Sequence, residues 1–254
     1  MIDNIKKAAS KFAESQGYTV IPTWRLNSYP QASYLQKLFA LLEIDCVFDV
    51  GANNGQFRDF LRYEVDYQGT IISFEAMPDY VERLRDRARQ DEHWLIEGYA
   101  LGSKSGTASF NVMAESQFSS FLQPDHSAVQ RFQDTNTVQR TVEVRVKTLA
   151  EVMPELKRKF EMHSAYLKMD TQGFDLEVVR GAGPHIRDFL ALQTEASVKP
   201  IYAGMPSYDV VIKTLEAEGF EPSGIFPNNS GHFPLLIEFD CHMISSSRVP
   251  KSAK

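Results

Sequence analysis

The 254-residue sequence has little cysteine, no long apolar run and no surplus of positive charge. Its two cysteines, Cys46 and Cys241, are too few for a disulfide scaffold or for a zinc site made of cysteines alone. No stretch approaches the roughly 18 apolar residues of a membrane span, and the N-terminal lysines are not followed by the apolar run of a signal peptide. The net charge of −6 gives no broad electrostatic footprint for nucleic acid. We therefore expect a cytoplasmic protein that binds neither a membrane nor nucleic acid.

The sequence also lacks internal repeats and low-complexity linkers, and its composition is that of a globular protein. Hydrophobic residues make up 43% of the chain and charged residues 24%, which excludes a disordered, collagen-like or coiled-coil chain. A chain of this length can bury a sizeable core as one large domain or as two small ones.

From residue 44 onward, short apolar strands alternate with amphipathic helices. This alternation predicts βαβ units and a parallel sheet with helices on both faces. Asp79 is expected to cap one helix, and Thr148 with Glu151 to form a capping box for a short helix that ends near Pro154. The expected strands are 46–50, 70–74, 94–101, 166–170, 190–195, 220–226 and 235–243.

The region from about 103 to 147 interrupts this alternation. Two segments in it, 108–112 and 142–146, alternate polar and apolar residues with period 2, as half-exposed strands do. They flank a polar stretch at 116–139. We interpret the region as an insertion and the polar stretch as a substrate lid, because loops of this length in compact domains are usually functional or mobile. The alternative for this stretch is a disordered excursion.

The strongest local signal is the segment VFDVGANNGQF, residues 47–57. An apolar strand ends at Asp49, and Gly51 and Gly55 bracket a tight turn into a helix, where glycine lets the backbone approach a ligand. The G-x-x-x-G spacing fits neither the dinucleotide-binding nor the P-loop fingerprint, and no lysine follows Gly55 to hold phosphates. Such glycines can also be purely structural, so the turn alone does not establish a binding site.

Acidic residues at the ends of strands add to this signal. Glu75 ends the strand after the turn, where a carboxylate can accept hydrogen bonds from both hydroxyls of a ribose. Asp49 would favour a cation such as a sulfonium or an α-amino group, and S-adenosylmethionine contains all of these parts. Asp170 and Glu195 end two further strands, and such ends share one edge of a doubly wound sheet. Lys168 shares a strand face with Asp170 and either pairs with it or points at the substrate.

Seven segments together resemble the FkbM-type methyltransferases, a branch of the class I S-adenosylmethionine-dependent enzymes. They run in family order across roughly residues 45–240, and the set is specific although no single piece is. The segments are VFDVGANNGQF (47–57), GTIISFEAMP (69–78), YALGSKSG (99–106), FSSFL (118–122), VKTLAEV (146–152), LKMDTQGFDLEVVRGA (167–182) and QTEASVKPIY (193–202).

The resemblance implies a Rossmann-like class I methyltransferase fold, with a seven-stranded, mostly parallel sheet, helices on both faces and an antiparallel last strand. Because the motifs follow one α/β order, we expect a single domain at 44–244 that contains the insertion. A helical extension at 1–43 would precede it, and a polar tail at 245–254 would follow. Family members that resemble this chain methylate hydroxyl groups, including those of sugars and polyketide-type natural products.

The resemblance also implies roles for individual residues. The glycine turn would hold the methionine end of the cofactor, the strand-end glutamate would bind the ribose, and an alanine–leucine pair would flank the adenine. Asp170, in the K-x-D-x-x-G motif, would face the transferred methyl group. The residues implied to bind S-adenosylmethionine are Asp49, Gly51, Asn53, Gly55, Glu75, Ala100, Leu101 and Asp170.

Methyl transfer from a sulfonium to a hydroxyl also needs a group that removes the hydroxyl proton. Asp170 is the first candidate for this general base, with Lys168 and Glu195 shaping its environment. A divalent metal held by Asp170, Glu195 and His232 would acidify a bound hydroxyl instead. The sequence shows no tight cluster of metal ligands, so we do not favour a metal. His232 is itself a candidate base, although isolated loop histidines are usually bystanders.

Two other functions stay open at this stage. A nucleotide-dependent oxidoreductase would use a similar fold, although the missing G-x-G-x-x-G fingerprint argues against it. The other is a catalytically silent module that kept the cofactor-binding fold. The sequence does not identify the acceptor beyond a hydroxylated small molecule such as a sugar or natural product, and it leaves open whether the chain forms a homo-oligomer.

Overall fold

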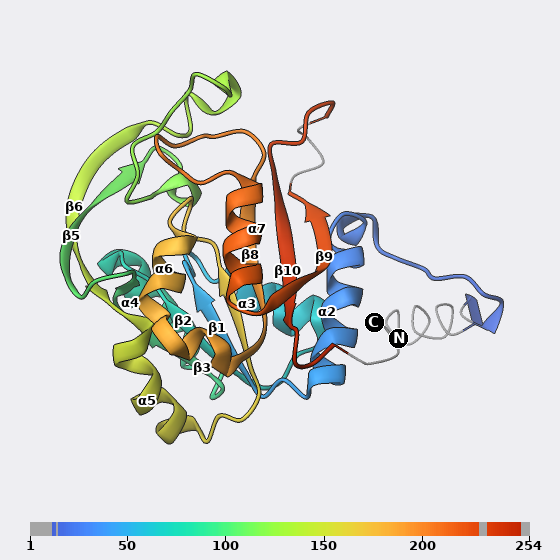
Figure 1. The fold of residues 1–254 in the computed structure, drawn as a ribbon. Coiled ribbons are helices and arrows are strands. Elements are labelled where there is room, and N and C mark those ends of the chain that lie inside the picture. The colour runs from blue at the N-terminus through green and yellow to red at the C-terminus, as the bar shows by residue number, and fades with distance from the viewer. Residues whose placement is uncertain (1–11, 14, 229–232, 250–254) are drawn as a thin grey trace.

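Seven strands form the main sheet of the computed structural model, which describes residues 12–13, 15–228 and 233–249 (Figure 1). The strand order is β3-β2-β1-β7-β8-β10-β9. Neighbouring strands from β3 to β8 pair in parallel, whereas β10 is antiparallel to both β8 and β9. The expected seven-stranded sheet with an antiparallel last strand is therefore confirmed. The strands are β1 (Cys46–Val50), β2 (Thr70–Phe74), β3 (Trp94–Glu97), β7 (Ala165–Met169), β8 (Phe189–Ser197), β9 (Phe220–Pro227) and β10 (Glu238–Ser245).

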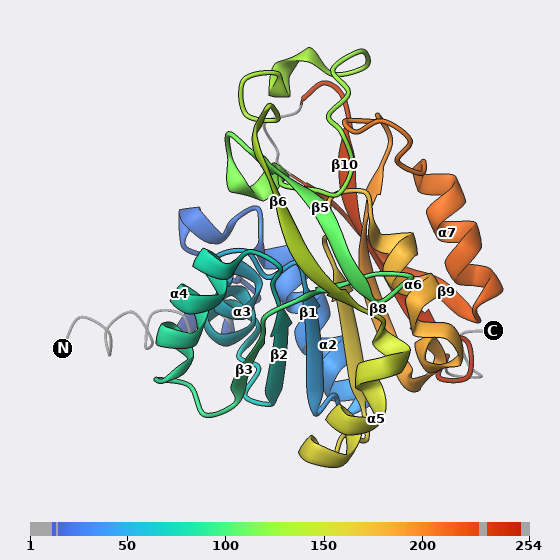
Figure 2. The ribbon, with the colours of Figure 1, turned by 90° about the vertical axis from the view of Figure 1, so that its left-hand side faces the viewer.

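A second, three-stranded sheet contains the predicted insertion. It has the order β4-β6-β5, with β4 (Ala100–Leu101), β5 (Gly106–Met113) and β6 (Val138–Lys147). The long strands β5 and β6 are antiparallel and reach beyond one edge of the main sheet (Figure 2). Both predicted strands of the insertion are thus present.

The prediction of a single strand at 94–101 is wrong, because this segment forms β3 and β4 in two different sheets. The chain turns between them, and Ala100 then pairs with Val146 of β6. The apolar run continues through the turn since Tyr99 and Leu101 are both buried. An apolar pattern reports burial and does not show which strand is the partner.

Helices cover both faces of the main sheet. One face packs against α5 (Leu149–Phe160), α6 (Asp175–Ala182) and α7 (Tyr208–Ala217). The other face packs against α2 (Tyr29–Leu42), α4 (Pro78–Ala88) and the helix formed by α3 (Gln56–Phe60) with its π-helical continuation η2 (Leu61–Val65). Short 3₁₀ turns are η1 (Thr23–Arg25), η3 (Ser116–Phe118), η4 (Gln130–Phe132) and η5 (Gly183–Asp188). None of the helices in the described part of the chain combines the length and the apolar character of a membrane span.

Two predicted helix ends differ from the structure. Asp79 lies in the first turn of α4 rather than at its cap, because the helix begins at Pro78, whose fixed φ and missing N–H suit a first position. The helix after Thr148 continues through Pro154 to Phe160. Thr148 Oγ1 accepts the Glu151 N–H at 3.2 Å, as expected. The buried side chains of the helix, Leu149, Val152, Met153 and Leu156, stabilise it beyond the proline.

The stretch expected to be a lid packs against the connection between β8 and α7. Asp125 donates its N–H to Ile201 O at 2.9 Å, and Asn136 Nδ2 donates to the same carbonyl at 3.0 Å. Val129 and Tyr202 are buried in a small apolar cluster between these segments. The insertion is therefore fixed over one end of the main sheet.

Candidate active site

A cavity of about 410 Å³ lies at the carboxyl ends of β1, β2, β7 and β8. Ligands bind at this edge in open α/β sheets, because the loops that follow the strands leave a crevice there. The sequence-predicted residues on the cavity wall are Gly51, Asn53, Glu75, Ala100, Leu101, Lys168, Asp170 and Glu195.

Two other predicted residues do not lie on this wall. Asp49 is fully buried behind it, where it bonds to neighbouring strands. Gly55 faces the ring of Trp94, which an added Cβ would approach to 2.9 Å. His232 lies outside the described residues.

The glycine turn after β1 has a backbone that requires Gly51. Its φ is +81°, and a Cβ built there would lie 2.0 Å from the carbonyl oxygen of Asp170. Only glycine lets β1 and β7 approach this closely. The N–H groups of Gly51 and Ala52 both donate to Phe74 O at 3.1 Å, which ties the turn to the end of β2.

Glu75 lies where β2 ends, and its carboxylate joins two loops. One oxygen accepts the N–H of Asn53 at 2.8 Å, and the other accepts the N–H of Met77 at 2.8 Å. Burial raises the pKa of Glu75, and these N–H donors oppose the rise. A carboxylate oxygen can accept two hydrogen bonds, so each oxygen keeps the capacity to accept one from a ligand hydroxyl.

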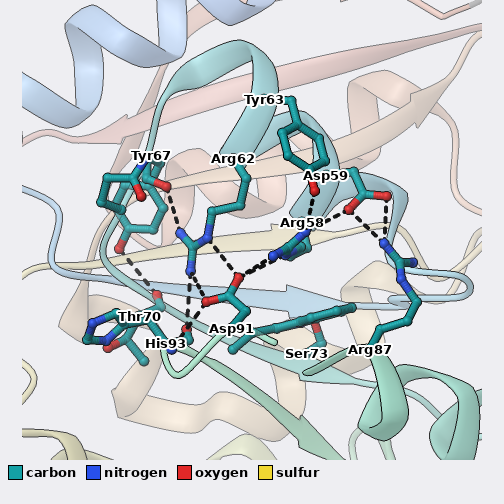
Figure 3. Close-up of polar contacts among 12 residues, drawn as sticks. Arg58, Asp59, Arg62, Tyr63, Tyr67, Thr70, Ser73, Arg87, Asp91 and His93 are labelled. Carbon is teal, nitrogen blue, oxygen red and sulfur yellow. Dashed lines mark hydrogen bonds and ion pairs between the residues drawn. The ribbon is translucent and has the colours of Figure 1, made fainter. Parts of the chain in front are cut away.

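A cluster of arginines supports the glycine turn from outside (Figure 3). Arg58 and Arg62 both donate to Asp91. Burial raises the pKa of Asp91, but hydrogen bonds from the two guanidinium groups lower it to about 2. Arg87 binds Asp59 and also donates to the carbonyl oxygen of Asn54, inside the turn. The cluster therefore connects the turn to α3 and to the loop before β3.

A row of polar residues crosses the sheet on the face covered by α2, α3 and α4. The strand registers place Ser73, Asp49, Lys168, Gln193 and His242 opposite one another in turn. All five residues are buried. Ser73 Oγ donates to Asp49 Oδ2 at 3.0 Å, and Lys168 Nζ donates to Asp49 Oδ1 at 3.0 Å. The row therefore places the charged ammonium group of Lys168 at the cavity wall.

Lys168 is the positive centre of the cavity. Besides Asp49, its ammonium group contacts Gly51 O at 3.3 Å and Asp170 Oδ2 at 3.5 Å. Burial lowers the pKa of Lys168, but the charges of Asp49 and Asp170 raise it well above its ordinary value. The side chain is therefore charged, and its ammonium group contacts three oxygens. Lys168 joins the glycine turn to Asp170 and is not poised to accept a proton.

Asp170 and Glu195 are bridged by an amide that the sequence analysis did not single out. Gln172 Nε2 donates to Asp170 Oδ1 at 2.9 Å and to Glu195 Oε2 at 2.8 Å. Asn228 Nδ2 donates to the other oxygen of Glu195 at 2.7 Å. Burial and the nearby carboxylate of Glu238 raise the pKa of Glu195 well above its ordinary value. Glu195 is thus held by two neutral amides, and Asp170 by one neutral amide and the Lys168 cation.

The insertion supplies one wall of the cavity. Phe121 packs between Phe110 and Phe174, with ring centroids 4.9 Å and 4.6 Å away. Phe110, Phe121 and Ser116 line the cavity, and the hydroxyl of Ser116 contacts the side chain of Asn53. Among the described residues, no group of three or more histidine, cysteine or acidic side chains is arranged to hold a metal ion.

Comparison with sequence models of protein families matches residues 49–222 to the methyltransferase FkbM domain. The chain belongs to this FkbM family. The match includes the glycine turn, Glu75, the insertion and the segment that follows β7. A comparison with curated proteins found no match.

Solved structures similar to this FkbM chain have low sequence identity. A methyltransferase FkbM from Methylobacillus flagellatus KT is 10% identical with a TM-score of 0.48, and the alignment covers 79% of this chain and 44% of that one. Aeropyrum pernix fibrillarin with natively bound S-adenosyl-L-methionine is 16% identical, with a TM-score of 0.45 and coverage of 86% and 76%. An S-adenosylmethionine-dependent methyltransferase from Aquifex aeolicus is 12% identical, with a TM-score of 0.43 and coverage of 88% and 94%. This chain thus spans less than half of the Methylobacillus protein.

Several residues of the FkbM chain reach the cavity without having been predicted to do so. Gln31 comes from α2 and Asp240 from β10, and both lie outside residues 49–222. Gln193 and Asp240 belong to polar positions that recur with period 2 in largely buried strands. These positions are Gln193, Glu195 and Ser197 on β8 and Glu238, Asp240 and His242 on β10, and this pattern was the available signal. Gln31 carried no such signal, because a glutamine on an amphipathic helix is usually exposed. The other unpredicted wall residues include Phe57, Phe60, Met77, Tyr80, Gln172 and Asn228.

Proposed function

We propose that this FkbM-family protein uses S-adenosylmethionine to methylate a hydroxyl group of a sugar or another natural-product small molecule. The observation that carries the proposal is the cavity wall formed by the glycine turn, Glu75 and Asp170 at the carboxyl edge of the sheet. Within this one cavity, Glu75 can accept hydrogen bonds from a ribose, and the glycine turn lets the backbone approach a ligand closely. Asp170 adds a carboxylate at the end of a strand. We further propose that the protein acts in the cytoplasm, in keeping with its two cysteine thiols, which are unpaired and buried.

The residues present fit the proposed cofactor. Glu75 retains acceptor capacity toward two hydroxyls, as a ribose requires. Ala100 and Leu101 give an apolar wall beside it for the adenine, and Gly51 with Asn53 forms the turn proposed for the methionine end. When bound, S-adenosylmethionine supplies a methyl group on a positively charged sulfur, which leaves as a neutral thioether. The acidic wall of the cavity suits that positive charge.

The acceptor end of the proposed site begins at Asp170. Its carboxylate is fixed by Lys168 and Gln172 before any ligand binds. A fixed hydrogen-bond acceptor orients an acceptor hydroxyl for in-line displacement, because alignment of the reacting groups lowers the entropic part of the barrier. Glu195 and Asn228 extend this end with further hydrogen-bonding groups for a hydroxylated molecule. Phe110 and Phe121 of the insertion line the cavity and give it an apolar wall.

The cofactor assignment is tested by calorimetry with S-adenosylmethionine and S-adenosylhomocysteine. We expect saturable binding of both, weakened at least about 10-fold in Glu75→Ala, because two charge-assisted hydrogen bonds to the ribose are lost. Glu82→Ala is the matched control, since Glu82 is exposed on the outside of α4. Tight binding of NAD with none of S-adenosylmethionine would contradict the proposal and favour an oxidoreductase.

Turnover is tested by transfer of a labelled methyl group to a panel of hexoses, inositols and phenolic alcohols. We expect transfer to at least one hydroxylated acceptor and a large loss in Asp170→Ala, because the carboxylate that orients the acceptor is removed. Cofactor binding without transfer, together with a cellular function that survives Asp170→Ala, would favour a catalytically silent module.

A further inference from the structure

Two residues of the cavity wall come from opposite ends of the chain and from outside the FkbM match at 49–222. Gln31 lies on α2 and Asp240 on β10. They meet in space because α2 packs on the sheet face that carries the polar row. Gln31 Nε2 donates to Asp240 Oδ2 at 2.9 Å. The family domain alone therefore does not complete this end of the cavity.

Gln31 is itself held by a buried histidine. Its Nε2 lies 3.1 Å from Nε2 of His242, which has no exposed surface. Burial lowers the pKa of His242 to about 3, so the ring is neutral. An amide nitrogen only donates, so His242 Nε2 accepts, and its Nδ1–H points to the Tyr166 hydroxyl at 2.7 Å. This chain of contacts fixes the orientation of the Gln31 amide, and hence that of Asp240.

Asp240 differs from Asp170 in its partners. Both oxygens of Asp170 are engaged, one by the Lys168 cation and one by Gln172. Asp240 is instead held by the neutral amide of Gln31 and opposes Glu195 across the β8–β10 pair. Burial of a carboxylate that is hydrogen-bonded by a neutral amide favours its protonated form, so Asp240 is suited to accept a proton.

We propose that Asp240 accepts the proton of the acceptor hydroxyl and that Gln31 is its positioning residue. The inference rests on the proposed function. As the acceptor oxygen uses a lone pair to form its new C–O bond, the S–C bonding pair stays with sulfur. The O–H proton passes to a carboxylate oxygen of Asp240 and then to water at the cavity mouth. Asp170 orients the hydroxyl, and Lys168 holds Asp170.

The acidity of Asp240 agrees with this role. Burial raises its pKa to about 6, and the hydrogen bond from Gln31 opposes the rise. A general base works best when its pKa lies near the operating pH. The other titratable groups that interact with Asp240 or lie beside it come from three strands. They are Tyr166, Lys168 and Asp170 at β7, Glu195 on β8, and Glu238, Cys241 and His242 on its own strand.

The test uses two cofactor analogues and needs no acceptor. Sinefungin carries an ammonium group where S-adenosylmethionine carries its methyl group, whereas S-adenosylhomocysteine carries nothing there. The ratio of their dissociation constants therefore reports negative charge at the position of methyl transfer. For the wild type at pH 8 we expect sinefungin to bind about 10-fold more tightly, as for one charge-assisted hydrogen bond. This preference should fall below pH 6 as Asp240 takes up a proton.

In Asp240→Asn we expect the preference to fall and to lose its change near pH 6, while the part that Asp170 contributes remains. The dissociation constant of S-adenosylhomocysteine should stay within about twofold of wild type. In Gln31→Leu the midpoint of the pH dependence should move upward, because the donor that stabilises the charged carboxylate is gone. A purely structural role for Gln31 would not move this midpoint. Asp134→Asn, on an exposed turn of the insertion, is the matched control.

Thermal melting of each variant shows whether it folds, and Gln31→Leu provides the test if Asp240→Asn does not. A full sinefungin preference in folded Asp240→Asn would overturn the proposal. So would an unchanged pH midpoint in Gln31→Leu. If the wild-type protein bound neither analogue, the proposed function itself would fail. If it bound both analogues but the variants behaved as the wild type does, only the role of Asp240 would fail.

Discussion

The two faces of the main sheet differ in chemistry although they are formed by the same strands. On the face covered by α5, α6 and α7, residues such as Phe48 and Leu167 are fully buried among apolar side chains. On the opposite face, their chain neighbours Asp49 and Lys168 form a buried ion pair. Because strand side chains alternate, one strand stabilises the fold with one residue and builds the cavity with the next.

This difference between the faces concerns what the buried polar row contributes to the folding free energy. A buried ion pair is often no more stabilising than apolar residues of the same size, because two charges lose their hydration. The polar row is therefore explained by what it holds in place, the glycine turn and Asp170, rather than by a gain in folding free energy. Neighbouring residues of β7 allow the two faces to be tested against each other.

The largest effect is expected for Lys168→Met on the polar face. Removing the ammonium group leaves the fully buried Asp49 carboxylate without its cation, which destabilises a protein by about 3–5 kcal/mol. Gly51 O and Asp170 lose the same donor, so S-adenosylmethionine binding should also weaken. Urea denaturation and calorimetry measure the two effects. The double variant Asp49→Leu/Lys168→Met should recover stability and not cofactor binding; recovery of neither would argue against the assigned role.

A smaller and purely structural effect is expected for Leu167→Ala on the apolar face. Leu167 has no exposed surface, and truncation of such a leucine costs about 2–5 kcal/mol through lost burial and a cavity. The dissociation constant of S-adenosylmethionine for the folded fraction should stay unchanged, because the side chain points away from the cavity wall. Weakened cofactor binding at a temperature where the variant is fully folded would show that the two faces are not independent.

The smallest effect concerns the dependence of stability on pH. The pKa of Asp240 is raised to about 6 in the folded protein, above its value in an unfolded chain. The folded state therefore binds this proton more tightly, and the contribution of Asp240 to stability falls as pH rises from about 4 to 6. Asp240→Asn removes that loss, so at pH 7 the variant should melt about 2–4 °C higher, as for about 1 kcal/mol. Equal shifts at pH 4 and pH 7 would contradict this linkage.

Much of the fold could be predicted from the sequence, because its main signals are local. Alternating strands and helices indicated the parallel sheet, and the period-2 segments around 108–112 and 142–146 indicated the second sheet. The wrong predictions concern segments whose local sequence pattern is compatible with two different structures. Pro154 ended a helix in the prediction, whereas the buried face of α5 outweighed the one missing hydrogen bond. The segment 94–101 was read as one strand because burial continued through a change of sheet.

The candidate site was predictable only where one segment carried its own signal. Gly51 and Glu75 follow from a turn and a strand end, each readable within about ten residues. The order of strands and helices along the sequence thus determined the FkbM-type α/β topology and the edge of the sheet at which the cavity lies. Tertiary structure alone decided that Gln31 would meet Asp240, 209 positions away, and that Lys168 would pair with Asp49 as well as with Asp170. Such pairings depend on strand register and helix packing, and no local pattern of residues encodes the distance between two side chains.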